Sequence, residues 1–192
     1  MKNIETKRLV LREFALEDFA ALDRAVYADP DVRRYCGRVR RFEELSGRLV
    51  YVVESPVGEK IREGGFGDEG FGSWTVRRRE DDQLVGQIVL GPADRAYWIV
   101  FESDPDSPYT SFEVELNCAL GTQYRGMGYA AEACRAVVRY ALEELRLRRL
   151  VTHLDEGNAM GIALARRLGF RIENNLHPEY GGLVAVLDNN FS

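Results

Sequence analysis

The chain is 192 residues long, which is enough for one domain with a substantial core. Hydrophobic residues make up 45% of it and charged residues 30%, as is ordinary for a soluble globular protein. Its 26 Lys and Arg against 31 Asp and Glu give a net charge of −5, which argues against a nucleic-acid-binding protein. We therefore expect a single domain over residues 1–192 without a nucleic-acid partner.

The cysteines and the apolar runs bear on the cellular compartment. Cys36, Cys118 and Cys134 are far apart, and such an odd, scattered set favours a reducing compartment over a disulfide framework or a metal site. His153 and His177 lack the Cys or carboxylate companions of a metal site. No apolar run reaches the ~20 residues of a membrane span, and no signal peptide is recognisable. The sequence predicts a cytoplasmic protein with neither membrane contact nor bound metal.

The first third of the chain predicts a strand and then helices. Residues 4–14 have the pattern of a strand, and residues 15–28 carry apolar side chains at helical spacing. Asp29 and Pro30 then favour a new helix start, with Asp29 as the N-cap. Residues 32–61 are expected to be partly helical, because several of their apolar residues also recur at helical spacing.

A glycine-rich stretch separates this region from predicted strands. Residues 63–73 predict a mobile loop, since so many glycines favour neither a helix nor a central strand. The loop is either a surface connector or a lid that closes over a substrate. Strands are predicted over residues 74–79 and 84–90, joined by a turn, and residues 97–101 are a candidate for another strand of this sheet.

Strands and helices alternate in the second half. Strands are predicted over residues 112–120, 150–154, 171–176 and 183–187, the last two as a hairpin. One amphipathic helix is predicted over residues 131–145, and a second starts at Asn158 and ends at Gly169. Together these elements predict a mixed α/β or α+β sheet.

A glycine-rich turn joins the strand at 112–120 to the helix that follows, and it reads Gln-Tyr-Arg-Gly-Met-Gly-Tyr-Ala over residues 123–130. The glycines at 126 and 128 lack Cβ atoms at the turn, so several backbone N–H groups can point into one concavity at the positive end of a helix. This predicts an anion site, and a simple tight turn is the plain alternative.

Two well-known phosphate motifs fit this turn poorly. A P-loop requires Lys followed by Ser or Thr after its last glycine, whereas Gly128 is followed by Tyr129 and Ala130. The dinucleotide fingerprint is matched literally, but the acids about 20 positions on, Glu143 and Glu144, lie in the predicted helix itself. A dinucleotide-binding oxidoreductase, which would bind NAD, is therefore a lower-ranked hypothesis.

Three ordered motifs resemble the GNAT superfamily of N-acetyltransferases. Residues 123–133 are similar to its Q/R-x-x-G-x-G/A motif, and residues 158–170 are similar to its Asn-opened helix that ends in Leu-Gly-Phe. Residues 4–12 and 140–145 resemble the branch that acetylates the N-termini of ribosomal proteins (the RimJ/RimL-like branch). The resemblance is dense over residues 112–173 and thin over residues 32–111.

The resemblance implies a mixed, mostly antiparallel sheet that is splayed between its fourth and fifth strands, with helices on both faces and acetyl-CoA in the split. Backbone amides of the 125–130 turn would hold the pyrophosphate, and the strand at 117–120 would pair with the pantetheine arm. The implied acetyl-CoA contacts are Asn117, Cys118, Ala119, Leu120, Gln123, Arg125, Gly126, Met127, Gly128, Tyr129, Ala130 and Asn158. Asn158 either contacts the cofactor arm or only caps its helix.

Acetyl transfer to an amine needs a base, acting directly or through water, because an ammonium group is not a nucleophile. Strand alternation places Glu113, Glu115 and Asn117 on one face, with Val114 and Leu116 on the other. Glu115 stands where the resembled branch commonly has a glutamate, so we predict it as catalytic base or amine anchor, with Glu113 as runner-up. A solvated glutamate, or one paired with an arginine, is the plain alternative.

The sequence departs from the family in the second motif. Ala165 stands where many relatives carry a tyrosine that protonates the leaving thiolate, so this acid is either absent or supplied elsewhere, with Tyr109 and Tyr180 as candidates. Gly161 stands where Ser or Ala is common. The basic residues 77–79 are either a solvated hairpin end or a contact for the 3′-phosphate of the cofactor.

The leading hypothesis is an enzyme that transfers an acetyl group from acetyl-CoA to a primary amine by direct attack in a ternary complex. The acceptor is a protein N-terminus or a small molecule, and a homodimer is compatible with the open sheet edges. The alternative is a CoA-binding sensor or interaction protein that has lost turnover. Residues 36–72 and 92–110 are where we expect acceptor selectivity to reside.

Overall fold

The structure is a computed structural model, and it describes residues 2–36, 38–45, 48–55, 58–63, 65–66, 71–93, 113–175 and 182–189. The strands are β1 (Ile4–Glu5), β2 (Leu9–Glu13), β3 (Arg38–Leu45), β4 (Arg48–Ser55), β5 (Gly58–Glu63), β6 (Gly65–Phe66), β7 (Phe71–Arg78), β8 (Leu84–Pro92), β9 (Val114–Leu120), β10 (Arg149–Leu154), β11 (Arg171–Asn174) and β12 (Leu183–Asp188). The helices are α1 (Phe19–Leu22), α2 (Pro30–Cys36), α3 (Tyr129–Arg139) and α4 (Ala159–Arg167). Single π-helical turns, Asp23–Tyr27 and Tyr140–Glu144, follow α1 and α3.

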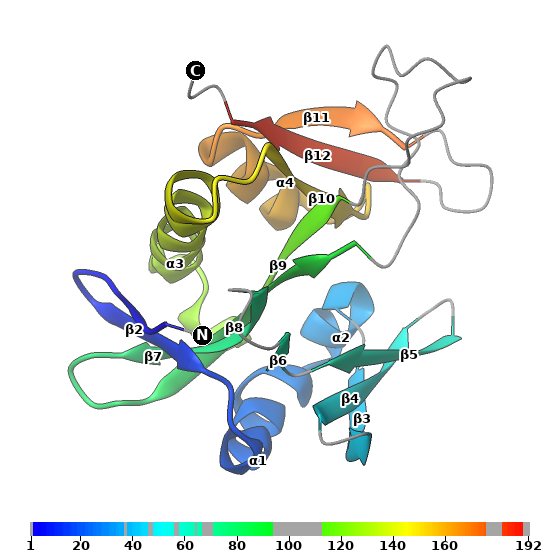
Figure 1. The fold of residues 1–192 in the computed structure, drawn as a ribbon. Coiled ribbons are helices and arrows are strands. Elements are labelled where there is room, and N and C mark those ends of the chain that lie inside the picture. Colours follow the sequence, from blue (N-terminus) through cyan, green and yellow to red (C-terminus); the bar gives the residue numbers. More distant parts are fainter. Residues whose placement is uncertain are drawn as a thin grey trace.

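Most described strands belong to one sheet, in the order β1-β2-β7-β8-β9-β10-β12-β11, with β6 attached to β7. The pair β9–β10 is parallel, and the other pairs along this order are antiparallel. Figure 1 shows α3 and α4 on one face of this sheet and α1 and α2 on the other. This mixed, mostly antiparallel α/β arrangement confirms the expected fold class.

The sheet splits between β9 and β10. These two strands share one register pair, Val151 with Glu115, whereas β9 pairs with β8 along its whole length, from Val114 to Leu120. Beyond Glu115 the parallel strands therefore separate toward their carboxyl ends. The splay predicted between the fourth and fifth strands of the family is confirmed at this place.

Side chains of β9 alternate between two cores. Leu116 is buried with Val137 of α3, whereas Ala119 is buried with Val32 of α2. Because strand side chains alternate, Glu115 lies on the same face of the sheet as Ala119. We call this the α2 face of the sheet, and the predicted division of Glu115 and Leu116 between opposite faces is confirmed.

The N-terminal elements follow the sequence pattern closely. Pro30 is the first residue of α2, and the Asp29 carboxylate accepts a hydrogen bond of 2.8 Å from the N–H of Asp31, as expected of an N-cap. Arg77 is not solvated, because its guanidinium donates a hydrogen bond of 2.6 Å to the buried Asp18. Burial alone would raise the pKa of Asp18, but this bond and a second from Arg12 hold it below its ordinary value.

The helical expectation for residues 32–61 is wrong after residue 36. Strands β3, β4 and β5 form an antiparallel sheet of their own there. The run Leu-Val-Tyr-Val-Val at 49–53 is rich in β-branched and aromatic residues, which favour strands. Its apolar residues fall at helical spacing as well, because in an unbroken apolar run every period is present.

The glycine-rich segment is also more ordered than expected. Strand β6 pairs with the start of β7, where Gly72 is flanked in register by Gly65 on one side and Leu90 on the other. Gly72 has a φ of 150°, a positive value that favours glycine, and it still pairs with a strand on each side. The expectation of a loop without a central strand is therefore wrong for the described part of this segment.

Several sequence predictions lie outside the described residues. These are the candidate strand at 97–101, the candidate acids Tyr109 and Tyr180, and His177. Within the described ranges, no helix is both long and apolar enough to span a bilayer.

Candidate functional site

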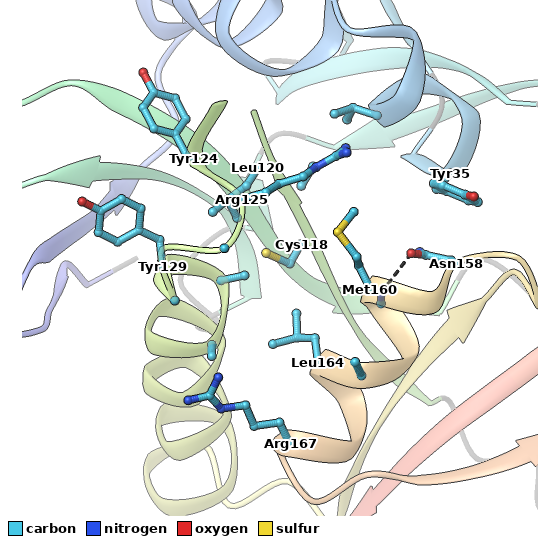
Figure 2. Close-up of a pocket in the computed structure, with 18 of the residues that line it drawn as sticks. Tyr35, Cys118, Leu120, Tyr124, Arg125, Tyr129, Asn158, Met160, Leu164 and Arg167 are labelled. Atoms are coloured by element: carbon cyan, nitrogen blue, oxygen red, sulfur yellow. Dashed lines mark hydrogen bonds between the residues drawn. The ribbon is translucent and has the colours of Figure 1, made fainter. Parts of the chain in front are cut away.

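A pocket of about 410 Å³ lies where β9 and β10 have separated. Its walls come from α2, the end of β9, the glycine-rich turn and the facing sides of α3 and α4 (Figure 2). The lining residues are Asp31, Val32, Tyr35, Cys118, Ala119, Leu120, Tyr124, Arg125, Gly126, Gly128, Tyr129, Ala130, Ala131, Asn158, Met160, Gly161, Ala163, Leu164 and Arg167.

Most of the predicted cofactor contacts meet at this pocket. Those that line it are Cys118, Ala119, Leu120, Arg125, Gly126, Gly128, Tyr129, Ala130 and Asn158. Three do not: Asn117 belongs to the α2 face of β9, Met127 is half exposed, and the Gln123 side chain donates to the carbonyl of Ala25 at 3.4 Å. Gln123 thus stabilises the turn. Binding of acetyl-CoA by the lining residues stays a prediction.

The glycine-rich turn has the backbone geometry of an anion site. Gly126 and Gly128 have φ values of 75° and 80°, in the left-handed region that side-chain-bearing residues avoid. Gly128 is the N-cap of α3, and no side chain caps this helix. The first N–H groups of α3 are therefore available to a ligand, and Tyr129, Ala130 and Ala131 bring them to the pocket wall.

A clamp from the β1–β2 connection holds this turn. The Arg8 guanidinium donates to the carbonyl of Met127 at 2.9 Å and to the carboxylate of Glu132, in the first turn of α3, at 2.6 Å. The same carboxylate accepts from the Thr6 hydroxyl and from the backbone N–H of Arg8. The Arg8 guanidinium also lies 4.6 Å from the ring centroid of Tyr129. These contacts fix the turn from outside the pocket.

Glu132 is the acceptor on which the clamp depends. Burial raises the pKa of Glu132, but the hydrogen bonds from Thr6 and Arg8 outweigh it, so the pKa lies below its ordinary value of 4.5. A carboxylate with a lowered pKa in the folded state stabilises that state above its unfolded pKa. This contribution is lost as the pH falls below 4.5 and through the folded-state pKa.

Replacing Glu132 with glutamine is expected to lower the unfolding free energy at pH 7 by about 1–3 kcal/mol, or roughly 2–10 °C in Tm. The difference from the wild type should shrink as the pH falls below 4.5, since protonation then removes the same charge from the wild type. Thermal unfolding between pH 3 and 8 measures this, with Glu143→Gln on the exposed side of the following turn as control. An equal difference at every pH would contradict the role assigned to the charge.

Two charged groups face each other at the mouth of the pocket. Arg125, in the glycine-rich turn, lies 4.0 Å from the carboxylate of Asp31 on α2. Arg167 adds a second cation to the lining, from the last turn of α4. The pocket thus offers cations and backbone N–H groups together, the combination that binds phosphate groups.

Asn158 acts as the N-cap of α4. Its side-chain oxygen accepts a hydrogen bond of 2.9 Å from the N–H of Gly161, so the capping interpretation is confirmed. Because this bond uses the oxygen, the side-chain NH₂ remains the group with which Asn158 can contact a ligand. The contact with a cofactor arm stays a prediction.

Replacing Asn158 with serine separates these two roles. Serine keeps an N-cap oxygen but has no NH₂ group, so Asn158→Ser should retain Tm within a few degrees and weaken acetyl-CoA binding about 3- to 10-fold if the NH₂ group donates to the cofactor. Asn158→Ala should also cost about 1 kcal/mol of stability. Calorimetric binding and thermal unfolding measure the two effects, and unchanged affinity in the serine variant would leave the cap as the sole role.

The predicted catalytic glutamates lie at the base of the split, outside the pocket lining. Glu115 is 5% exposed, and its carboxylate accepts from the backbone N–H of His153 on β10 at 3.5 Å. Glu113 pairs with Arg149, which donates to it at 2.7 and 2.9 Å. For Glu113 the structure thus shows the plain alternative of an arginine pair, whereas Glu115 stands where the two strands separate.

The sequence pointed to α4 through Asn158, but it did not point to the α2 wall of the pocket or to the other α4 side chains of the lining. Asp31, Val32 and Tyr35 lie on one side of α2, and Met160 and Leu164 on one side of α4. The sequence predicted that helices begin at Pro30 and Asn158. However, no local pattern indicates that α2 packs against the end of β9. That placement depends on contacts between segments distant in the sequence.

One cysteine of the pocket lining, Cys118, contacts Cys134 of α3. Contact with Cys134 of α3 and burial raise the pKa of the Cys118 thiol well above its usual value, so Cys118 is protonated at neutral pH. In the described residues, no three side chains of His, Cys, Asp or Glu gather in an arrangement that could hold a metal ion.

Comparison with known proteins identifies the family. The family model for the GNAT acetyltransferase domain matches residues 8–171, most of the chain. The chain belongs to the GNAT acetyltransferase family. It is thus an acyltransferase.

Two curated relatives of this GNAT chain carry the name N-acetyltransferase. It is 25% identical over 171 residues to the uncharacterized N-acetyltransferase YnaD of Bacillus subtilis, covering 89% of this chain and 84% of the relative. It is 25% identical over 185 residues to the uncharacterized N-acetyltransferase p20 of Bacillus licheniformis, covering 92% and 86%.

Solved structures share the fold of this GNAT chain. An acetyltransferase from Agrobacterium tumefaciens superposes with a TM-score of 0.68 at 23% identity, covering 97% of this chain and 94% of that one. A Vibrio cholerae protein named "putative ribosomal-protein-serine acetyltransferase" superposes with a TM-score of 0.62 at 18% identity, covering 97% of both chains. At these identities the likeness establishes the fold alone.

Proposed function

We propose that this GNAT protein transfers an acetyl group from acetyl-CoA to a primary amine by direct attack in a ternary complex. The observation that carries the proposal is the uncapped N-terminus of α3 opening into the split between β9 and β10. A diphosphate is the part of acetyl-CoA that suits these N–H groups and Arg125. The apolar wall of Cys118, Ala119 and Leu120 suits its pantetheine arm.

The reaction would run on the α2 face, at the base of the split. Glu115 accepts a proton from the acceptor ammonium, directly or through water, or anchors the amine. The amine nitrogen then attacks the thioester carbonyl carbon, and a backbone N–H near residues 117–119 stabilises the developing oxyanion. The nitrogen releases its second proton to water, the C–S bond breaks, and the electron pair leaves on sulfur. Alignment of the two reactants in one cleft supplies much of the rate.

The acceptor of the acetyl group belongs to one of two classes of amine. A protein N-terminus is supported by the resemblance of residues 4–12 and 140–145 to the branch acting on ribosomal proteins, and by the name of the Vibrio cholerae structure. A small-molecule amine is the other acceptor class. We further propose that residues 1–192 act as one acetyltransferase domain, and we keep a homodimer and a cytoplasmic location as predictions.

A CoA-binding sensor without turnover is the second candidate. The observation that favours it is Ala165, which is buried in the core beneath α4 and offers no hydroxyl to a leaving thiolate. In this alternative the pocket binds CoA without catalysing a reaction. The bound protein would then act through a change in its conformation.

The test combines cofactor binding with a screen of acceptors. Acetyl-CoA should raise Tm in proportion to its saturation, because it binds the folded state. Release of free thiol is then followed with N-terminal peptides, polyamines, aminoglycosides and amino acids as acceptors. Thiol release with one class supports the enzyme and names its acceptor, binding without turnover favours the sensor, and no CoA binding rejects both. NAD binding in place of CoA binding would favour an oxidoreductase.

A further inference from the structure

Helix α2 forms one wall of the pocket on the side where the acetyl group must arrive. Asp31, Val32 and Tyr35 line the pocket from this helix. Val32 is 3% exposed and packs with Ala119, which places α2 on the same face of the sheet as Glu115. An acetyl group that reaches Glu115 therefore emerges beside α2.

Tyr35 reaches across the split from this wall. Its hydroxyl donates a hydrogen bond of 3.2 Å to the carbonyl of Gly157, in the connection between β10 and α4. Gly157 directly precedes Asn158, whose side chain also lines the pocket. The phenol thus lies between the two rims of the cleft, one formed by α2 and the other by the start of α4.

The other two tyrosines of the lining point elsewhere. Figure 2 shows the hydroxyls of Tyr124 and Tyr129 on the opposite side of the pocket, directed away from it. The ring of Tyr129 is covered by Arg8, and the guanidinium of Arg78 lies 6.0 Å from the ring centroid of Tyr124. Of the three lining tyrosines, Tyr35 is therefore the one whose hydroxyl lies between α2 and the start of α4.

Helix α4 supplies no proton donor to the pocket from its middle. Gly161, Ala163 and Leu164 line it there, and Ala165 is buried. Since the hydroxyls of Tyr124 and Tyr129 are directed away and an amide NH₂ is not an acid, the other neutral acid in the lining is the Cys118 thiol, which packs toward the opposite face, against Cys134 and the α3 core. The Tyr35 phenol is thus the acidic hydroxyl of the lining that comes from the α2 side.

We propose that Tyr35 is a further catalytic residue, which donates its phenolic proton to the sulfur of the departing CoA; this rests on the proposed acetyl transfer. As the C–S bond breaks, sulfur receives the electron pair and the proton of the Tyr35 O–H. The phenolate regains a proton, through solvent, from the carboxyl group that accepted one from the amine. Rotation of the hydroxyl about its C–O bond redirects the proton from Gly157 to the ligand without movement of the ring.

The test compares CoA with desulfo-CoA, which lacks the sulfur, by calorimetric titration. The wild type should bind CoA about fivefold more tightly, since one hydrogen bond to sulfur is lost with desulfo-CoA. Tyr35→Phe should remove this preference while keeping the desulfo-CoA affinity within about twofold, and should lower kcat about 10²-fold. The desulfo-CoA affinity of the same variant reports whether its pocket is still folded.

Cys118→Ala separates the two neutral donors, and it is expected to keep the preference for CoA. Loss of the preference in Cys118→Ala together with its retention in Tyr35→Phe would overturn the assignment of Tyr35. An active wild type whose Tyr35→Phe variant keeps both kcat and the preference would overturn it as well. A wild type that fails to bind acetyl-CoA, or binds it without turnover on any amine, would instead mark failure of the proposed function.

Discussion

Replacing Glu115 with glutamine is expected to lower kcat roughly 10²–10⁴-fold and to leave the acetyl-CoA Kd within about twofold. Glutamine keeps the size and the acceptor oxygen that meets the N–H of His153, but it cannot take a proton from the amine. The carboxylate lies at the base of the split and outside the pocket lining, so cofactor binding should not depend on its charge. Steady-state kinetics and calorimetric binding on the same preparation measure both quantities.

Two other carboxamide variants sharpen this comparison. Glu113→Gln breaks the pair with Arg149 and should cost stability with little change in rate, because Glu113 lies one strand step farther from the split. Glu143→Gln removes an exposed charge from the turn after α3 and should change neither. Loss of rate in Glu113→Gln with retention in Glu115→Gln would move the base to Glu113.

Replacing Gly128 with valine is expected to weaken acetyl-CoA binding about 10- to 100-fold, with a smaller effect on Tm. Gly128 has a φ of 80°, which costs a β-branched residue about 1–3 kcal/mol. An added Cβ would also lie 3.4 Å from Nη2 of Arg8, in the clamp that fixes the turn. Relief of this strain would change the backbone at the first N–H groups of α3, which are the proposed diphosphate ligands.

Gly169 provides the matched control for the backbone effect. It too has a positive φ, 92°, but it ends α4 away from the pocket, and an added Cβ would meet its nearest neighbour at an ordinary 3.7 Å. Gly169→Val should therefore lose stability while keeping its affinity for acetyl-CoA. Similar loss of affinity in both variants would show that strain acts through global stability rather than through the anion site.

The sequence predicted best where local chemistry decides the structure. The N-caps Asp29 and Asn158 and the turn around Gly128 have short-range causes, a side-chain acceptor or a missing Cβ, and all three were placed correctly. The alternation that sets Glu115 apart from Leu116 depends only on strand geometry, and it was readable for the same reason.

Predictions were wrong or missing where the structure depends on contacts between segments that are far apart in the sequence. The apolar run at 49–53 has both helical and strand periods, and its pairing with β3 and β5 selects the strand. The pocket wall at Tyr35 follows from the docking of α2 beside the end of β9, more than 80 residues away in sequence. The role of Arg8 was invisible for the same reason, since its acceptor Glu132 is 124 residues away.

The strands β9 and β10 share a single register pair, so few backbone hydrogen bonds join the two halves of the long sheet. How firmly these halves are held together therefore depends on what fills the gap between the two strands. Backbone amides of β9 that face this gap have no strand partner, so they should exchange with deuterium faster than those directed toward β8. A bound pantetheine arm would act as a surrogate strand, slowing that exchange and coupling the halves mechanically. The protein would then be stiffest while it holds its acyl donor and loosest just after it has released the spent thiol.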